Sequence, residues 1–149
     1  MTKQTVYLII AVFLGLSISV PVLASTRVNT FIDNGNGSVT DAATGLVWQQ
    51  QDDDVTRNHA DAITYCQDLS LAGSSNWRLP NIKELLSIVD YRANSPSIVS
   101  SMFPGTNSFF YWSATGLTGS SGSAWYTHFL SGEVDISLTT ENFFVRCVR

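Results

Sequence analysis

The chain has 149 residues, of which 44% are hydrophobic and 13% are charged, and its formal net charge is −4. Lysine and arginine form no run. The clustered positive charge that neutralises nucleic-acid phosphates is therefore missing, and a nucleic acid is excluded as the expected partner. The length is that of one domain with a single sizeable hydrophobic core.

The first 24 residues have the organisation of a secretory signal peptide. Lys3 precedes an apolar run, Val6–Val22, and the small residue Ala24 stands before the expected cleavage point. The alternative is an uncleaved anchor helix, for which the run is short and Pro21 is unfavourable. We expect an exported single domain, Ser25–Arg149, in the periplasm or outside the cell, with no stable membrane span after cleavage. Because the leader holds one lysine and no acid, its removal takes the net charge from −4 to −5.

Cys66 and Cys147 are the two cysteines of the chain. Export implies an oxidising compartment, so one disulfide is the first expectation. The chain-entropy model values such a long closed loop at about 4.5 kcal/mol. A reactive thiol or a metal pair is the alternative, but zinc would need further ligands, and His59 and His128 lack ligand-like spacing. No cofactor is expected.

The beginning of the domain predicts β structure. FIDNGNGSVTDAATGLVW contains two β segments, and its two Asn-Gly pairs are strong hairpin signals. An EF-hand calcium loop that starts at Asp33 fails, because Gly35 and Gly37 stand where oxygen ligands are needed.

A polar loop with the sequence QQQDDD follows. Its carboxylates, Asp52, Asp53 and Asp54, are weak candidates for a calcium site, because three consecutive residues rarely face one point. A solvated loop is the expected structure, and no metal site is predicted with it.

The first predicted helix covers about Arg57–Leu71. Thr56 or Asn58 can cap its N-terminus. Three residues at helical spacing mark its inner face: Ala62, Cys66 and Leu69.

The stretch NWRLPNIKELLSIVD combines an extended lead-in with a second helix. Trp77 and Leu79 alternate on the extended part and are expected to be buried, and Pro80 turns the chain into the helix. Asn81 can cap this helix, and Glu84 can complete a capping box.

Arg78 lies between these apolar neighbours. We expect its guanidinium to hold the junction by binding carbonyl groups or a nearby acid. Contact with a ligand is the alternative.

The last third of the domain predicts β structure after an irregular segment, Tyr91–Thr106. A flexible polar loop is expected at Gly116–Ser123. Strands are expected at four places: Phe109–Trp112, Ala124–Leu130, Glu133–Leu138 and Asn142–Arg149.

Alternation in the last two of these strands predicts which residues point inward. Cys147 belongs to the inner face of the terminal strand. Glu133 and Asp135 share a solvated face opposite Val134 and Ile136, and they lie on one strand rather than across a cleft as glycosidase carboxylates do. With two helices and a run of antiparallel strands, the fold class is α+β.

Five motifs together, GLVWQQ, YCQDL, NWRLPNIKELLSIVD, FFYWSAT and VRCVR, resemble the Lcl C-terminal domain family from about Phe31 to Arg149. That family is named after the globular head of a bacterial collagen-like adhesin and is grouped with C-type-lectin-like folds. The resemblance implies two helices packed on a twisted antiparallel sheet, with the N- and C-terminal strands close together. It also implies a disulfide from the first helix to the last strand, where Cys66 and Cys147 stand. The collagen-like Gly-X-Y stalk is absent from this sequence.

Two activities of related folds lack their residues here. Calcium-dependent lectins use Glu-Pro-Asn or Gln-Pro-Asp together with Trp-Asn-Asp, and none of these triplets occurs. Formylglycine-generating enzymes need a redox-active cysteine pair near the C-terminus, where this chain has Cys147 alone.

The expected function is that of an exported, non-catalytic binding module for a polysaccharide or for a protein of the cell envelope or surface. Trp112, Trp125 and Tyr126 are candidate ligand contacts because aromatic faces stack on sugar rings, although core packing is the alternative for each. Ser120 and Ser121 are candidates through their loop. The alternatives are an enzyme that acts on envelope polysaccharide and a structural component of a surface appendage.

Overall fold

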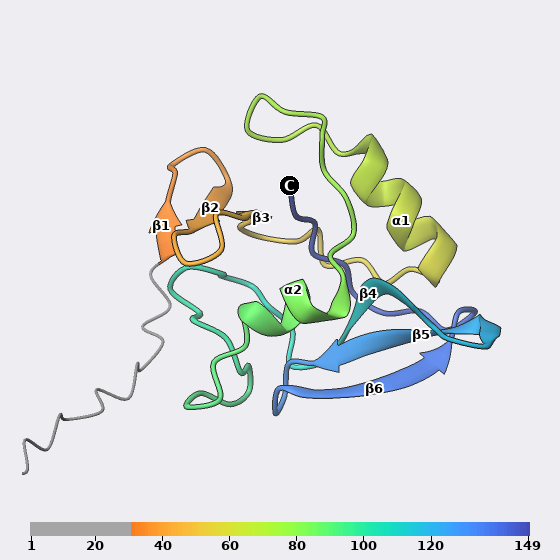
Figure 1. Cartoon of the computed structure of the whole chain (residues 1–149). Helices are drawn as coiled ribbons and strands as arrows, with labels where there is room; N and C mark the ends of the chain where they lie inside the picture. The colour runs from red at the N-terminus through yellow and green to blue at the C-terminus, as the bar shows by residue number, and fades with distance from the viewer. Residues whose placement is uncertain (1–30) are drawn as a thin grey trace, which may run out of the picture.

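The computed structural model describes residues 31–149, which form an α+β domain (Figure 1). The domain contains two helices and two three-stranded antiparallel sheets, so the predicted fold class and the two helices are confirmed. The predicted signal peptide, residues 1–24, lies outside the described residues. Within the described part, no helix is long and apolar enough to cross a membrane.

The first sheet is small and lies near the start of the domain. It consists of β1 (Phe31–Asp33), β2 (Ser38–Asp41) and β3 (Val47–Gln49), in that order. Gly35 and Gly37 turn the chain between β1 and β2 at φ values of 69° and 84°, where a residue without Cβ is favoured. Val39 and Trp48, which pair across β2 and β3, are fully buried and join this sheet to the core.

Both helices begin at an asparagine. They are α1 (His59–Asp68) and α2 (Ile82–Ser87). The Asn58 side chain accepts a hydrogen bond from the Asp61 N–H at 3.0 Å. Asn81 accepts from the Glu84 N–H at 2.9 Å, and the Glu84 carboxylate accepts from the Asn81 N–H at 2.8 Å, which completes the predicted capping box. α1 is shorter than predicted at both ends, because the cap lies at Asn58 and the chain turns back through a Leu71–Ser74 bridge.

The second sheet contains β4 (Phe110–Leu117), β5 (Ser120–His128) and β6 (Glu133–Leu138), in that order. The expectation of a flexible loop over Gly116–Ser123 is wrong, because this segment is the tight end of the β4–β5 hairpin. Gly116 pairs with Ala124, and Leu117 pairs with Ser120 around a two-residue turn. Gly119 supplies the positive φ of 84° that this turn needs.

The two faces of the second sheet lie against different helices. Alternation places Tyr111 and Trp125 on the side of α2, and Trp112 and Tyr126 on the side of α1. We call these the α2 face and the α1 face. α2 packs on β4 and β5, so the apolar residues of β6 on the α2 face are exposed. Glu133 and Asp135 are exposed as expected, but the opposite face with Val134 and Ile136 is exposed as well.

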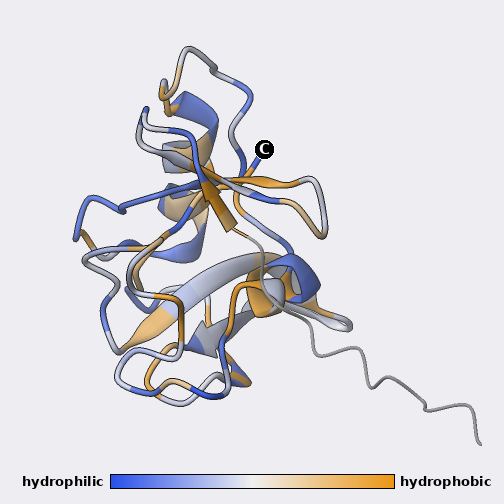
Figure 2. Cartoon of the chain, turned by 90° about the vertical axis from the view of Figure 1, so that its left-hand side faces the viewer, coloured by the Kyte–Doolittle hydropathy of each residue, from blue (hydrophilic) through white to orange (hydrophobic). Residues whose placement is uncertain are grey.

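The C-terminal segment, predicted as a strand over Asn142–Arg149, forms isolated bridges instead of a regular strand. Its backbone bridges two elements that are distant in sequence. The Gln49 N–H donates to the Cys147 carbonyl at 2.9 Å, and Arg78 and Val148 exchange two hydrogen bonds of 2.9 Å. The C-terminus consequently lies beside the first sheet in both Figure 1 and Figure 2. The two ends of the domain are thus close together, but two small sheets replace the expected single twisted sheet.

Candidate functional site

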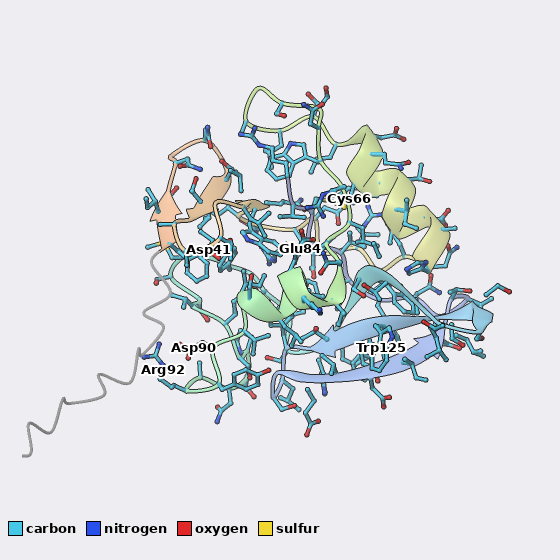
Figure 3. All side chains as sticks on the ribbon, viewed as in Figure 1. Asp41, Cys66, Glu84, Asp90, Arg92 and Trp125 are labelled. Atoms are coloured by element: carbon cyan, nitrogen blue, oxygen red, sulfur yellow. A yellow bond between two sulfur atoms is a disulfide. The ribbon has the colours of Figure 1, made fainter. Side chains whose placement is uncertain are left out.

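The disulfide lies deep in the core. Cys66 of α1 and Cys147 of the C-terminal segment are bonded, with their Cα atoms 5.5 Å apart and 81 positions apart in sequence. Both side chains are fully buried, and Cys66 extends from α1 toward the centre of the domain in Figure 3. The predicted pairing is confirmed. It leaves no free thiol in the part of the chain that the structure describes.

The lead-in to α2 is held by an ion pair. Trp77, Leu79 and Pro80 are buried, as expected from their alternation and from the proline turn. The two terminal guanidinium nitrogens of Arg78, Nη1 and Nη2, donate to the two Glu84 carboxylate oxygens at 2.7 Å each. Arg78 therefore binds the residue that closes the capping box, although 47% of its side chain is exposed.

This ion pair also sets the charge state of Glu84. The hydrogen bonds from Arg78 hold the Glu84 pKa below its ordinary value of 4.5, with a smaller contribution from the Asn81 N–H. The ion pair positions the N-terminus of α2, and it leaves the Arg78 guanidinium and the Glu84 carboxylate bound to each other. These contacts indicate a structural role for Arg78.

The three consecutive carboxylates after β3 bind three different partners. Asp53 pairs with Arg57, and Asp54 accepts from the Asn107 side chain at 2.8 Å. Asp52 is buried and accepts from the Tyr111 hydroxyl at 2.7 Å. The structure does not bring them to one point. No group of three potential metal ligands occurs among residues 31–149.

Asp52 belongs to a buried network that the sequence reasoning missed. Arg146 is fully buried and donates to the Asp52 carboxylate at 3.1 Å, to the Thr106 hydroxyl at 2.8 Å and to the Gln49 carbonyl at 2.8 Å. Burial raises the pKa of the Tyr111 hydroxyl, which stays protonated and donates to Asp52. The sequence signal was the arginine between Val145 and Cys147, because a segment buried on both sides needs acceptors for such a residue.

The candidate aromatic residues lie in three different environments. Trp112 is fully buried, stacks on Phe143 at 4.3 Å between centroids, and donates its indole N–H to the Arg57 carbonyl at 2.9 Å. It is a core residue with no surface open to a ligand. Trp125 is partly buried on the α2 face, and Figure 3 places it on β5 below α2. Tyr126 is partly exposed on the α1 face.

The candidate serines lie at the tip of the β4–β5 hairpin, away from Tyr126 along β5. The Ser120 hydroxyl bonds that of Ser123 at 3.4 Å within the hairpin. Ser121 lines a shallow hollow together with the N-terminal residues of α1. In that hollow, the His59 ring is already paired with the Ser113 carbonyl at 2.8 Å.

A cleft on the β5–β6 hairpin brings an aromatic ring and two carboxylates together. Its volume is about 400 Å³, and five residues line it: Tyr126, His128, Glu133, Val134 and Asp135. The strand register places Asp135 opposite Tyr126 and Glu133 opposite His128 on the α1 face. Phe110 lies beside both rings, with its centroid 4.7 Å from that of Tyr126 and 4.5 Å from that of His128. We call this site the hairpin cleft.

The electrostatics of the hairpin cleft keep Tyr126 in its neutral form. Partial burial raises the pKa of the Tyr126 hydroxyl, and the charge of Asp135 raises it further. A neutral phenol offers a flat ring and one hydrogen-bond donor, whereas ionised carboxylates accept hydrogen bonds. The cleft can therefore hold a molecule that has both an apolar face and hydroxyl or amine groups.

A second hollow of about 450 Å³ lies along α1 and includes Arg57, Tyr65 and Asp61. The Arg57 guanidinium lies over the Tyr65 ring at 3.9 Å and pairs with Asp53. The charged groups of this hollow are thus already bound to each other. In the hairpin cleft, by contrast, no hydrogen bond between side chains of the described residues engages Tyr126, His128 or Glu133. The hairpin cleft is the stronger candidate for a ligand site.

Comparison with known proteins gives one family. The model described as the Lcl C-terminal domain matches residues 37–149, which include both helices, the second sheet and both cysteines. No curated protein matches the chain. The match agrees with the resemblance that the sequence motifs indicate.

Proposed function

The chain belongs to the Lcl C-terminal domain family, and on that premise we propose that it is an exported, non-catalytic domain that binds carbohydrate through the hairpin cleft. The family suggests a domain of a surface protein, in keeping with the leader expected at residues 1–24 and with the disulfide. A C-type-lectin-like relationship of the fold forms part of this proposal. The periplasm or the cell exterior is the proposed location.

The observation that carries the proposal is the pairing of Tyr126 with Asp135 across β5 and β6. A sugar ring presents a face of C–H groups and a rim of hydroxyl groups. The Tyr126 ring, backed by Phe110, suits the apolar face. Asp135 and Glu133 suit the hydroxyl rim, because hydrogen bonds to an ionised acceptor are short and strong.

The placement of the carboxylates favours binding over hydrolysis. Glu133 and Asp135 are two positions apart on one strand and point to the same side. Glycosidases place their two carboxyl groups on either side of the scissile bond. A ligand in the hairpin cleft would meet both acids from one direction, which suits recognition.

A glycan-array screen of the oxidised chain, expressed with its own N-terminus, tests the proposal. We expect binding to one class of polysaccharide, unchanged by EDTA because the carboxylates of residues 52–54 are dispersed. Tyr126→Ala should weaken this binding about fivefold or more, since stacking contacts of this kind contribute about 1 kcal/mol. Tyr91→Ala is the matched control, because Tyr91 is 70% exposed and does not line the cleft.

Three outcomes would contradict the proposal. A blank array would indicate that the ligand is a protein of the cell envelope or surface and not a carbohydrate. Equal binding by the Tyr126 and Tyr91 variants would place the glycan elsewhere. Shortening of the bound polysaccharide during incubation would show an enzyme.

A further inference from the structure

Strand β6 exposes apolar side chains on the α2 face. Val134 and Ile136 are 39% exposed, and Leu138 is 59% exposed. They lie beside Thr127, Trp125 and Ser123 of β5. α2 packs on β4 and β5 and does not cover them. A row of three aliphatic residues on one strand thus meets solvent.

The outer edge of β6 is not paired with another strand of the described chain, although its Leu138 carbonyl accepts from the Glu141 N–H at 3.0 Å. The Thr139 N–H donates inward to the Gly122 carbonyl at 2.9 Å, so odd-numbered residues of this strand face β5 with their backbone groups. The Ile136 N–H accordingly points outward, where its hydrogen bond goes to the carboxylate of the preceding Asp135 at 2.8 Å. Val134 and Leu138 share this outward direction because the period along a strand is two.

β6 lacks several features that commonly prevent an edge strand from pairing with another strand. Proteins commonly block an open edge with lysine, proline, a bulge or a covering segment. Glu133–Leu138 contains no lysine and no proline, and its pairing with β5 is regular. Within residues 31–149 no other strand pairs with this edge, which forms a border of the domain in Figure 1.

We propose that β6 pairs antiparallel with β6 of a second copy of this chain, with the two-fold axis at Ile136. In this register Ile136 lies opposite the partner's Ile136, and Val134 lies opposite the partner's Leu138. The outward N–H and C=O groups of these three residues then pair with their equivalents, and the two sheets become one of six strands. In this pairing the Ile136 N–H exchanges the Asp135 carboxylate for the partner's carbonyl, and the Leu138 carbonyl accepts a second hydrogen bond beside that from the Glu141 N–H. The three exposed aliphatic residues of each copy form one continuous apolar row on the α2 face.

Charge is compatible with the register centred on Ile136 and disfavours the register centred on Asp135. With the axis at Ile136, Asp135 lies opposite the partner's Ser137, a neutral residue that can donate a hydrogen bond. A shift of the axis to Asp135 would place two carboxylates directly opposite each other, which is destabilising. The sequence EVDISL can therefore pair with itself about Ile136 without placing like charges opposite each other, with its acids on one face and its aliphatic residues on the other. A second copy supplies this complement without any further partner.

The pairing also determines how two hairpin clefts are presented. A two-fold axis perpendicular to the sheet keeps both clefts on the same face, side by side. If the clefts bind a polysaccharide, which rests on the proposed function, the dimer would hold one chain at two points and gain avidity. The dimer itself does not depend on carbohydrate binding.

Sedimentation equilibrium of the oxidised full chain, over about a hundredfold range of concentration, measures this association by mass action. The wild type should change reversibly from monomer to dimer. Ile136→Lys and Ile136→Glu should each weaken dimerisation about tenfold or more, because residue 136 faces its own copy at the axis. An equimolar mixture of the two variants should dimerise again, since lysine then lies opposite glutamate.

Ile32→Lys is the matched control, because Ile32 is an exposed isoleucine on the edge strand of the other sheet. It should leave dimerisation unchanged, and all variants should melt as the wild type does at a concentration where each is monomeric. The proposal is overturned if the wild type is monomeric throughout, if Ile136→Lys dimerises as the wild type does, or if the mixture stays monomeric. These results are independent of the glycan array, so either proposal can fail alone.

Discussion

Strand β6 and the C-terminal segment are neighbours in sequence and lie in opposite surroundings. In the C-terminal segment, Val145, Arg146, Cys147 and Val148 are all buried, because β3 lies on one side and the lead-in to α2 on the other. In β6, both the acids and the aliphatic residues meet solvent. The comparison shows where this domain is rigid scaffold and where it has surface available for partners.

The difference arises mainly from neighbours. Both segments carry apolar residues at every second position, which predicts a strand with a buried face, but the C-terminal segment adds the apolar residues Phe144 and Val148 on its other side. The C-terminal segment crosses the middle of the domain, so even its arginine must find acceptors there. β6 is added at an edge, beyond the reach of α2, so its apolar face has no cover from the described residues.

The largest expected effect concerns the buried ion pair of the scaffold. Arg146→Ala should lower the free energy of unfolding by about 3–5 kcal/mol, because Asp52 would stay buried without its cationic partner. Urea denaturation of the oxidised chain measures this change. In the double variant Arg146→Ala with Asp52→Asn, the loss should be smaller than the sum of the two single losses. Additive losses would show that the pair is not coupled.

Two substitutions by threonine compare the two segments directly. Val145→Thr should cost about 1–3 kcal/mol, because it buries a hydroxyl group in an apolar cluster. Ile136→Thr should stay within about 0.5 kcal/mol of the wild type, because the side chain is exposed. Thermal unfolding at a concentration where the chain is monomeric measures both. Similar losses at the two positions would remove the distinction between scaffold and open edge.

The smallest expected effect concerns the helix cap. Glu84→Gln should cost about 1 kcal/mol near neutral pH, because the capping box and a half-exposed ion pair are both weakened. The Glu84 pKa is lower in the folded chain than its ordinary value of 4.5. The stabilisation is therefore complete above that value and is lost as pH falls below it. The gap in unfolding free energy between wild type and variant should close below about pH 4.5.

Asp90→Asn is the control for this measurement. Asp90 also pairs with an arginine, but Arg92 is 75% exposed. Loss of the Asp90 carboxylate should leave the unfolding free energy close to that of the wild type. A gap for Glu84→Gln that stays constant down to low pH would contradict the assignment of the ion pair.

The sequence predicted most of the features that depend on local chemistry. The Asn-Gly turn, the Asn81–Glu84 capping box and the strand Glu133–Leu138 follow from residue types at short range. The disulfide followed from the count of cysteines and the expected export. What the sequence could not specify was which neighbour covers which face. For that reason Trp112 was a candidate ligand contact and proved to be core, and the burial of Arg146 was missed.

The candidate site was predicted in part for the same reason. Tyr126 was among the expected ligand contacts, and Glu133 and Asp135 were expected to share a face. Their meeting in one cleft depends on the register between β5 and β6, which no short motif specifies. Ser120 and Ser121 were expected to belong to a flexible loop. The tight turn instead places them at the tip of the β4–β5 hairpin, away from Tyr126.

The most direct test of the account is an NMR titration of the isotope-labelled, oxidised chain with the polysaccharide fragment that the array selects. We expect the signals of Tyr126, His128 and Asp135 to shift with one common affinity. The signals of Asp52 and Arg146 should stay in place, because the scaffold does not take part in binding. Shifts that centre on the α1 hollow around Arg57 and Tyr65, with Tyr126 unchanged, would contradict the assignment of the hairpin cleft.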